Sequence, residues 1–177
     1  MKKLMTMALI ASGLMISANS VAQNMPEDKS KRPSKADTVT QKIKGGATIT
    51  IAYSQPLLKS RTIGKDVEPM DGKVWRTGAN EATTFETDKD VTINGKNLAA
   101  GKYGFFTLFN GDKVTLIFNK TWNQWGAFNY KEADDVLRVD AKKTNASSST
   151  EAMTFKISNA GVVTLLWGKM KVEFTVH

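Results

Sequence analysis

The sequence contains no cysteine and a single histidine, His177. Without cysteine the chain cannot form disulfides, so packing must stabilise the fold. The lone histidine argues against Ser-His-Asp catalysis, and the lack of cysteine removes Cys-His catalysis. Together the two shortages remove nearly every zinc site built from nitrogen and sulfur ligands. We therefore expect no metal site and no other cofactor.

Helical patterns are also missing from the sequence. After residue 22, no stretch repeats its apolar residues about every three to four positions, as an amphipathic helix would. The glycines Gly95, Gly101 and Gly104 fall between predicted strands, and no helix follows them. A phosphate-binding loop of the usual kind needs a strand followed by a helix, so nucleotide hydrolysis is disfavoured.

The first 22 residues have the pattern of a secretory signal peptide. Lys2 and Lys3 precede an uncharged run from Leu4 to Ile16, and small residues follow up to Ala22. The run is too short to cross a bilayer, which takes about twenty apolar residues. We predict cleavage after Ala22, a periplasmic or secreted product, and no transmembrane segment in the mature chain.

Residues 23–44 form a polar, basic lead-in segment. Six of these residues are basic and three are acidic, in a chain whose formal net charge is +8. Charged lead-in segments are usually solvated, so we interpret this one as a tether or a lead-in strand. Because export separates the protein from nucleic acid, we expect no nucleic-acid partner. An anionic small molecule, a glycan or another envelope component is the partner that we expect instead.

Residues 45–177 have the pattern of one β domain. Ile49, Ile51 and Tyr53 alternate with small residues, which is the period of a half-buried strand. The Asn-Gly pairs at 94–95 and 110–111 favour tight turns, because both residue types tolerate positive φ. The segments on either side of the second turn, "KYGFFTLFN" and "KVTLIFN", are apolar on both faces and should pair centrally. We predict a single antiparallel β-sandwich, or a barrel-like sandwich, of about nine short strands.

The C-terminal part should contain four of these strands. "VLRVDA" begins one strand at Val136, and the serine-rich stretch from Lys142 to Thr150 is predicted to be a mobile loop. "MTFKI", "VVTLLW" and "MKVEFTV" follow as three separate strands. Their turns are expected at Ser158 to Gly161 and at Gly168-Lys169.

The stretch "VWRTGANEATTF", residues 74–85, places Arg76, Asn80 and Glu81 close together among aromatic and β-branched residues. Arginine binds carboxylate and phosphate groups through two parallel hydrogen bonds, and its planar head stacks on aromatic rings. Arginines near an aromatic cluster could therefore hold an anionic ligand. Structurally, Arg76 could instead pair with Glu81 across the turn while Asn80 caps backbone amides. The full set of candidate ligand-binding or structural residues is Tyr53, Arg61, Trp75, Arg76, Asn80, Glu81, Trp125 and Arg138.

Two further alternatives concern carboxylates and tryptophans. Glu81 with Asp134 or Asp135 could form the carboxylate pair of a glycosidase-like hydrolase. Trp122 and Trp125 form either an aromatic platform for sugar rings or a cover over the open end of the core. Since catalytic bases are scarce, we favour a non-catalytic binding or structural module for an anionic or glycan-like ligand. The hydrolase is the competing hypothesis.

Four segments together resemble a known family. "YSQPLLKSRTIG", "VWRTGANEATTF", "INGKNLAAGKYGFFTL" and "WGAFNYKEADDVLRVDA" occur in that order. They are similar to the recurring blocks of a bacterial secreted family catalogued as domain of unknown function 2911. The resemblance covers Val39 to Lys143, and its most specific part is "WRTGANEAT". It implies an exported, β-rich domain and no particular activity.

Overall fold

The computed structural model describes residues 28–177, so the predicted signal peptide and the first residues of the lead-in segment lie outside it. Apart from two short 3-10 turns, the regular elements of this part are strands. Within it, no helix is long and apolar enough to span a membrane. In chain order the elements are η1 (Lys29–Lys31), β1 (Lys35–Lys42), β2 (Thr48–Gln55), β3 (Val74–Trp75), β4 (Thr83–Thr87), β5 (Val91–Ile93), β6 (Lys96–Leu98), β7 (Gly101–Asn110), β8 (Lys113–Asn119), η2 (Glu132–Asp134), β9 (Asp135–Ile157) and β10 (Val162–Thr175).

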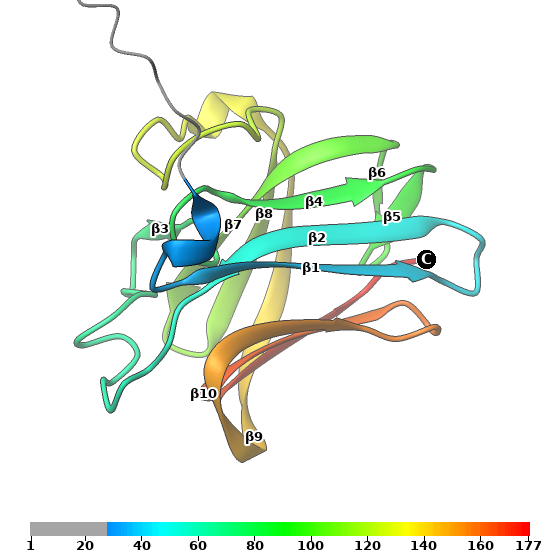
Figure 1. The fold of residues 1–177 in the computed structure, drawn as a ribbon. Helices are drawn as coiled ribbons and strands as arrows, with labels where there is room; N and C mark the ends of the chain where they lie inside the picture. The colour runs from blue at the N-terminus through cyan, green and yellow to red at the C-terminus, as the bar shows by residue number, and fades with distance from the viewer. Residues whose placement is uncertain (1–27) are drawn as a thin grey trace, which may run out of the picture.

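One antiparallel sheet contains most of the strands. Its order is β1-β2-β4-β7-β8-β9-β10, with β3 added to β7, and β5 and β6 form a separate hairpin. The sheet curls until the β9–β10 hairpin faces β1 and β2 across the core (Figure 1). Backbone contacts join the two sides, such as the bridge between Leu57 and Ala152 and the bond from Lys44 N to Asn159 O at 2.8 Å. The predicted all-β, antiparallel and barrel-like fold is confirmed.

The core lies inside this curl and is rich in aromatic rings. Phe85 of β4, Phe105 of β7 and Phe118 of β8 meet with ring centroids 5.1–6.5 Å apart. On the opposite face of the same strands, Phe106 and Ile117 are also fully buried. Strands β7 and β8 are therefore buried on both sides, which confirms the central hairpin that their sequence predicts.

Two of the predicted tight turns, at Asn94-Gly95 and at Ser158 to Gly161, are present. Asn94 and Gly95, with φ of 46° and 82°, connect β5 to β6. Between β9 and β10, Ser158 N binds Val162 O and Gly161 N binds Ser158 O, each at 2.9 Å. Both turns contain residues with positive φ, which are Asn94 and Gly95 in the first and Gly161 in the second. Glycine and asparagine adopt positive φ more readily than other residues.

Two predictions for the C-terminal part are wrong. The stretch from Lys142 to Thr150 is not a loop but the middle of β9, where it pairs with β10. A polar stretch can extend a strand when a neighbouring strand satisfies its backbone groups, since strand preference depends strongly on context. There is also no turn at Gly168-Lys169, because β10 continues through this point with a shift of register. The register shifts on both sides of Gly168, whose φ of +58° is a conformation that glycine adopts easily.

The lead-in segment contributes an edge strand. Strand β1 pairs with β2 along its whole length, from Lys35 opposite Gln55 to Lys42 opposite Thr48. Most of its side chains are exposed, as the burial pattern shows. Charged and polar residues on such an edge protect it from pairing with other chains.

Candidate functional site

The segment from Trp75 to Ala82 forms a rigid bend between β3 and β4. Trp75 Nε1 donates to Gly78 O at 3.1 Å, and Thr83 Oγ1 donates to Thr77 O at 2.8 Å. A Cβ at Gly78 would lie 2.9 Å from Thr83 Oγ1 and 3.1 Å from a backbone oxygen of β2, so only glycine fits there. Thr77 and Asn80 have φ of 52° and 59°, which turns the chain sharply at both positions.

Two distant segments are fastened to this bend. Asn80 Nδ2 donates to Ser34 O at 3.1 Å, and Gly126 N donates to Asn80 O at 3.0 Å. Arg32 forms an ion pair with Glu81 at 2.7 Å, and its guanidinium lies 5.2 Å from the centre of the Trp125 ring. The structure thus brings the candidates Asn80, Glu81 and Trp125 together.

Arg32 is the member of this group that sequence reasoning missed. Its side chain is only 9% exposed although it belongs to the basic lead-in segment. A charge in a polar N-terminal segment is usually solvated, so no local signal marks Arg32 as a buried partner.

The predicted pair between Arg76 and Glu81 is wrong. Glu81 pairs with Arg32, and Arg76 has no ion pair to any residue in the part of the chain that the structure describes. The predicted cap is wrong as well, because the Asn80 amide donates to a carbonyl rather than accepting from backbone amides. Arg76 and Glu81 do not meet because the positive φ at Thr77 and Asn80 turns the chain between them. Their side chains line two different cavities.

The first of these, which we call the arginine cavity, has a volume of about 370 Å³. Trp75, Arg76, Arg61 and Trp167 are part of its lining. The Trp75 and Trp167 rings stack at 6.0 Å with an interplanar angle of 17°, and both are buried. The arrangement therefore combines two cationic side chains with a stacked indole wall, as the sequence predicts for Arg61, Trp75 and Arg76.

Two donors at the arginine cavity have no acceptor. The Nε of Arg76 and the Nε1 of Trp167 are buried and form no hydrogen bond with residues 28–177. Burial lowers the pKa of Arg76, and the nearby Glu68 carboxylate partly opposes this effect. An arginine keeps its proton even so, because its ordinary pKa is so high. The site thus contains a partly desolvated cation and an unused indole N–H.

The other charged groups of the arginine cavity already have partners. Arg61 donates to the carbonyls of Leu57 and Leu58 at 2.6 and 2.9 Å. Asp66 accepts from Thr62 N at 2.8 Å, and Glu68 accepts from a backbone N–H at 2.8 Å. These bonds hold the loop after β2 in shape, so Arg76 is the charged group of the lining that has no hydrogen-bond partner among residues 28–177.

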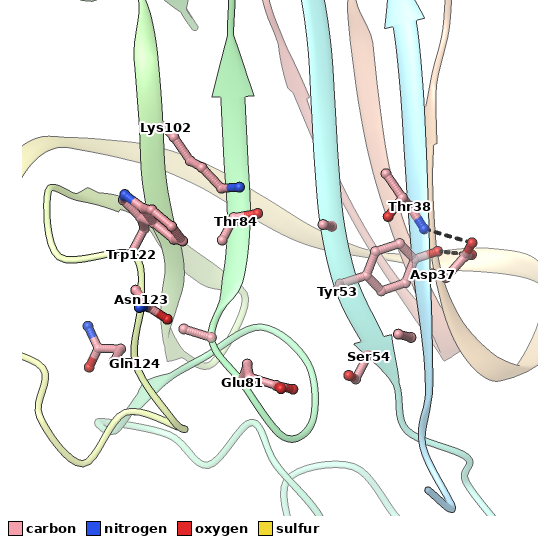
Figure 2. A pocket seen from close by; sticks show the side chains of 13 residues that line it. Asp37, Thr38, Tyr53, Ser54, Glu81, Thr84, Lys102, Trp122, Asn123 and Gln124 are labelled. Carbon is pink, nitrogen blue, oxygen red and sulfur yellow. Dashed lines mark hydrogen bonds between the residues drawn. The ribbon is translucent and has the colours of Figure 1, made fainter. Parts of the chain in front are cut away.

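The second cavity, which we call the tryptophan cleft, has a volume of about 240 Å³. Figure 2 shows Trp122 and Lys102 on one side of it, Asp37 and Tyr53 on the other, and Glu81 at one end. Trp122 is 40% exposed. Trp125 on the same loop is 50% exposed, and neither ring belongs to the buried core.

Tyr53 connects three strands rather than presenting a free hydroxyl. Its OH donates to Asp37 at 2.9 Å and accepts from Phe155 N at 3.1 Å, and its ring contacts the Phe155 ring edge-on. Burial, together with the Asp37 charge, raises the pKa of Tyr53 to about 12. The phenol therefore stays protonated at neutral pH and ties β1 and β2 to β9.

Arg138 belongs to a third group that lines neither cavity. It binds Asp135 at 2.9 Å, Tyr130 at 3.3 Å and Glu132 at 3.3 Å. Burial and the hydrogen bond to Asp135 raise the pKa of Tyr130. Sequence reasoning therefore grouped Arg138 with residues from which the fold separates it.

The carboxylates that could serve a hydrolase also have partners. Asp134 pairs with Lys120 at 3.2 Å, and Asp135 accepts from Asn119, Tyr130 and Arg138. Neither lines the tryptophan cleft with Glu81, and the carboxylate residue that does is Asp37. Among residues 28–177, no three acidic, histidine or cysteine side chains are grouped so that they could hold a metal ion.

Comparison with known proteins gives one match. The model of the family described as "Protein of unknown function (DUF2911)" matches residues 34–176, in agreement with the resemblance noted from the sequence. Neither the curated proteins nor the solved structures contain a match.

Proposed function

The chain belongs to the DUF2911 family, whose description assigns no activity, and from the geometry we propose that the protein binds a small anionic ligand in the arginine cavity. The predicted leader further suggests that it does so outside the cytoplasm. In this proposal the protein is a binding module, and the chemistry of the bound molecule is left unchanged.

The observation that carries the proposal is the pair of unsatisfied donors, Arg76 Nε and Trp167 Nε1. A buried donor without an acceptor destabilises a protein by about 1–3 kcal/mol, and native structures contain few of them. Trp167 is 1% exposed, so solvent does not readily satisfy its N–H. A carboxylate or phosphate oxygen in the cavity would accept from the Arg76 guanidinium and neutralise its charge.

The remaining charges limit the kind of anion. Asp66 and Glu68 also line the arginine cavity and balance the formal charges of Arg61 and Arg76. A polyanion would meet these carboxylates, whereas a ligand with one anionic group could contact Arg76 alone. The volume of about 370 Å³ fits a small metabolite better than a polymer. We therefore propose a compact ligand that carries one carboxylate or phosphate group.

Thermal melting with matched small ligands tests this proposal. Lactate supplies a carboxylate, glycerol 3-phosphate supplies a phosphate, and uncharged glycerol is the control for the carbon skeleton. We expect at least one of the anions to raise the melting temperature of the purified protein, with no shift from glycerol. The difference between the two anions identifies which group the site prefers.

Arg76→Met is the decisive variant, and Arg138→Met is its matched control outside the cavity. We expect Arg76→Met to abolish the melting shift and to leave the ligand-free protein as stable as the wild type, or more stable by about 1 kcal/mol, because it removes an unsatisfied buried donor. Arg138→Met should retain the shift. A shift that persists in Arg76→Met, or no shift with any anion, would contradict the proposal.

A further inference from the structure

The tryptophan cleft has a floor of small side chains. On the face of the sheet away from the main core, Thr38 of β1 lies opposite Ala52 of β2, and Ala52 lies opposite Thr84 of β4. The same row continues to Gly104 of β7. A Cβ on Gly104 would lie 3.1 Å from Thr121 O, so glycine allows the loop after β8 to approach the sheet closely. A row without large side chains leaves a shallow trough across several strands.

Trp122 forms one wall of this trough. The loop that carries it is anchored where Ala82 N donates to Gln124 O at 2.9 Å. Lys102 Nζ lies 4.5 Å from the centre of the Trp122 ring, and 40% of the residue stays exposed. Figure 2 shows the indole standing at the edge of the cleft beside Asn123, with Thr84 nearer the middle. A large aromatic ring is thus held at the rim of a polar hollow.

The charges around the tryptophan cleft are already paired. Glu81 pairs with Arg32 at 2.7 Å, and Lys102 pairs with Glu86 at 3.5 Å. Asp37 accepts from Thr38 N at 2.8 Å and from the phenol of Tyr53. A charged ligand would have to compete with these partners. A neutral ligand would not, and it would meet uncharged hydroxyl and amide groups instead.

We propose that the tryptophan cleft binds one sugar unit of a neutral oligosaccharide, whose other units extend over the surface outside the cleft. A pyranose ring has an apolar C–H face that packs on an exposed indole, and a rim of hydroxyls that both donate and accept hydrogen bonds. Thr38, Thr84 and Asn123 line the cleft, and their side chains form no hydrogen bond with residues 28–177, so they can bind such hydroxyls. Phe128 of the same loop is 82% exposed and does not line the cleft.

This site is separate from the arginine cavity and does not depend on the function proposed for it. The two share the bend from Trp75 to Ala82, but Arg76 lines one and Glu81 lines the other. The arginine cavity offers unsatisfied donors to an anion, whereas the tryptophan cleft offers an exposed ring and neutral polar groups. Arg76→Met should therefore leave saccharide binding unchanged.

Titration with defined hexasaccharides tests the inference. Cellohexaose, laminarihexaose and chitohexaose are neutral and differ in linkage or acetylation. We expect at least one of them to bind the purified protein, as measured by calorimetry and by a change in tryptophan fluorescence. Trp122→Ala should weaken that binding by about tenfold or more, which corresponds to ~1.4 kcal/mol. Phe128→Ala, which removes an exposed ring outside the cleft, should bind within about twofold of wild type.

Filling the floor gives a second, independent variant. Ala52→Phe should block the trough while leaving Trp122 in place, and Thr84→Gln serves the same purpose if the first variant does not fold. Circular dichroism verifies the fold of each variant. If none of the three hexasaccharides binds, or if Trp122→Ala and the floor variant bind like the wild type, the inference is overturned. Binding to phosphatidylglycerol vesicles that depends on Trp122, without saccharide binding, overturns it in favour of a membrane surface.

Discussion

The two cavities on either side of the Trp75 to Ala82 bend differ in how their polar groups are satisfied. In the arginine cavity, Arg76 Nε and Trp167 Nε1 have no partner among residues 28–177. In the tryptophan cleft, the buried side-chain atom without a partner among residues 28–177 is an acceptor, Gln124 Oε1, while the carboxylate of Glu81 is paired and the largest ring, Trp122, is exposed. One short segment thus supports a buried site with a cationic donor and an indole N–H that lack partners, and an open site with neutral groups. Arg76 and Glu81 are close in sequence but line different cavities, so the direction of each side chain decides to which site it contributes.

The largest expected effect on stability comes from removing the Trp75 ring, which packs under the bend. Trp75 is 2% exposed, stacks on Trp167 and donates to Gly78 O. Trp75→Ala should lower the free energy of unfolding by about 3–5 kcal/mol, because it leaves a large cavity. It should weaken ligand binding at both sites together. Urea denaturation measures the change in the free energy of unfolding.

Trp125→Ala is the matched control for this experiment. Its ring is 50% exposed, so its removal should change the free energy of unfolding by about 1 kcal/mol or less. If Trp75→Ala melted like the wild type, Trp75 could not be the support shared by the two sites.

An intermediate effect should appear at alkaline pH. The pKa of Tyr53 is raised to about 12 in the folded protein, whereas an unperturbed tyrosine has a pKa of about 10. A raised pKa stabilises the fold below the unfolded value, and this contribution is lost as pH rises from about 10 through 12. Over this range we expect stability to fall by about 1–2 kcal/mol more in the wild type than in Tyr53→Phe.

Denaturation curves of the two proteins between pH 8 and pH 12 make this comparison. Because other tyrosines and lysines titrate in both proteins, only the difference between the curves reports on Tyr53. Parallel curves would mean that Tyr53 is not buried against β9 and does not support the tryptophan cleft.

The smallest effect should come from the ion pair that closes one end of the tryptophan cleft. Arg32 is 9% exposed at its side chain and Glu81 is 37% exposed, so solvent screens the pair in part. A double-mutant cycle with Arg32→Met and Glu81→Gln should give a coupling energy of about 1 kcal/mol. Lys102 and Glu86, both more exposed, form a control pair whose coupling should be about 0.5 kcal/mol or less. Equal coupling in the two pairs would remove any special role for Arg32.

Much of the fold could be predicted from local sequence. The alternation of Ile49, Ile51 and Tyr53 indicates a strand because side chains point to opposite faces at every second residue. Asn94-Gly95 indicates a turn because both residues accept positive φ. Strands β7 and β8 are apolar on both faces, and a strand of this kind is buried in the middle of a sheet wherever it pairs. Each of these signals depends on neighbours in the chain alone.

The candidate site was less predictable. Asn80, Glu81 and Trp125 do come together, and Arg61, Trp75 and Arg76 line one cavity. The wrong pairing of Arg76 with Glu81 followed from treating the four residues 77–80 as a simple turn, when two positive φ values separate the side chains. Trp167 was missed because an apolar strand residue gives no sign that its N–H will lack an acceptor.

The sequence by itself determined the strand-rich composition, the tight turns and the absence of cysteine chemistry, because these depend on residue type and local spacing. Only the tertiary structure decided that Arg32 reaches Glu81, 49 residues further along the chain. It also decided that the serine-rich part of β9 is a strand, since β10 supplies the backbone partners. The physical reason is the same in both cases. A charge or a backbone amide is satisfied by whichever group the folded chain places within hydrogen-bond distance, and for distant segments that group is set by the packing of the sheet.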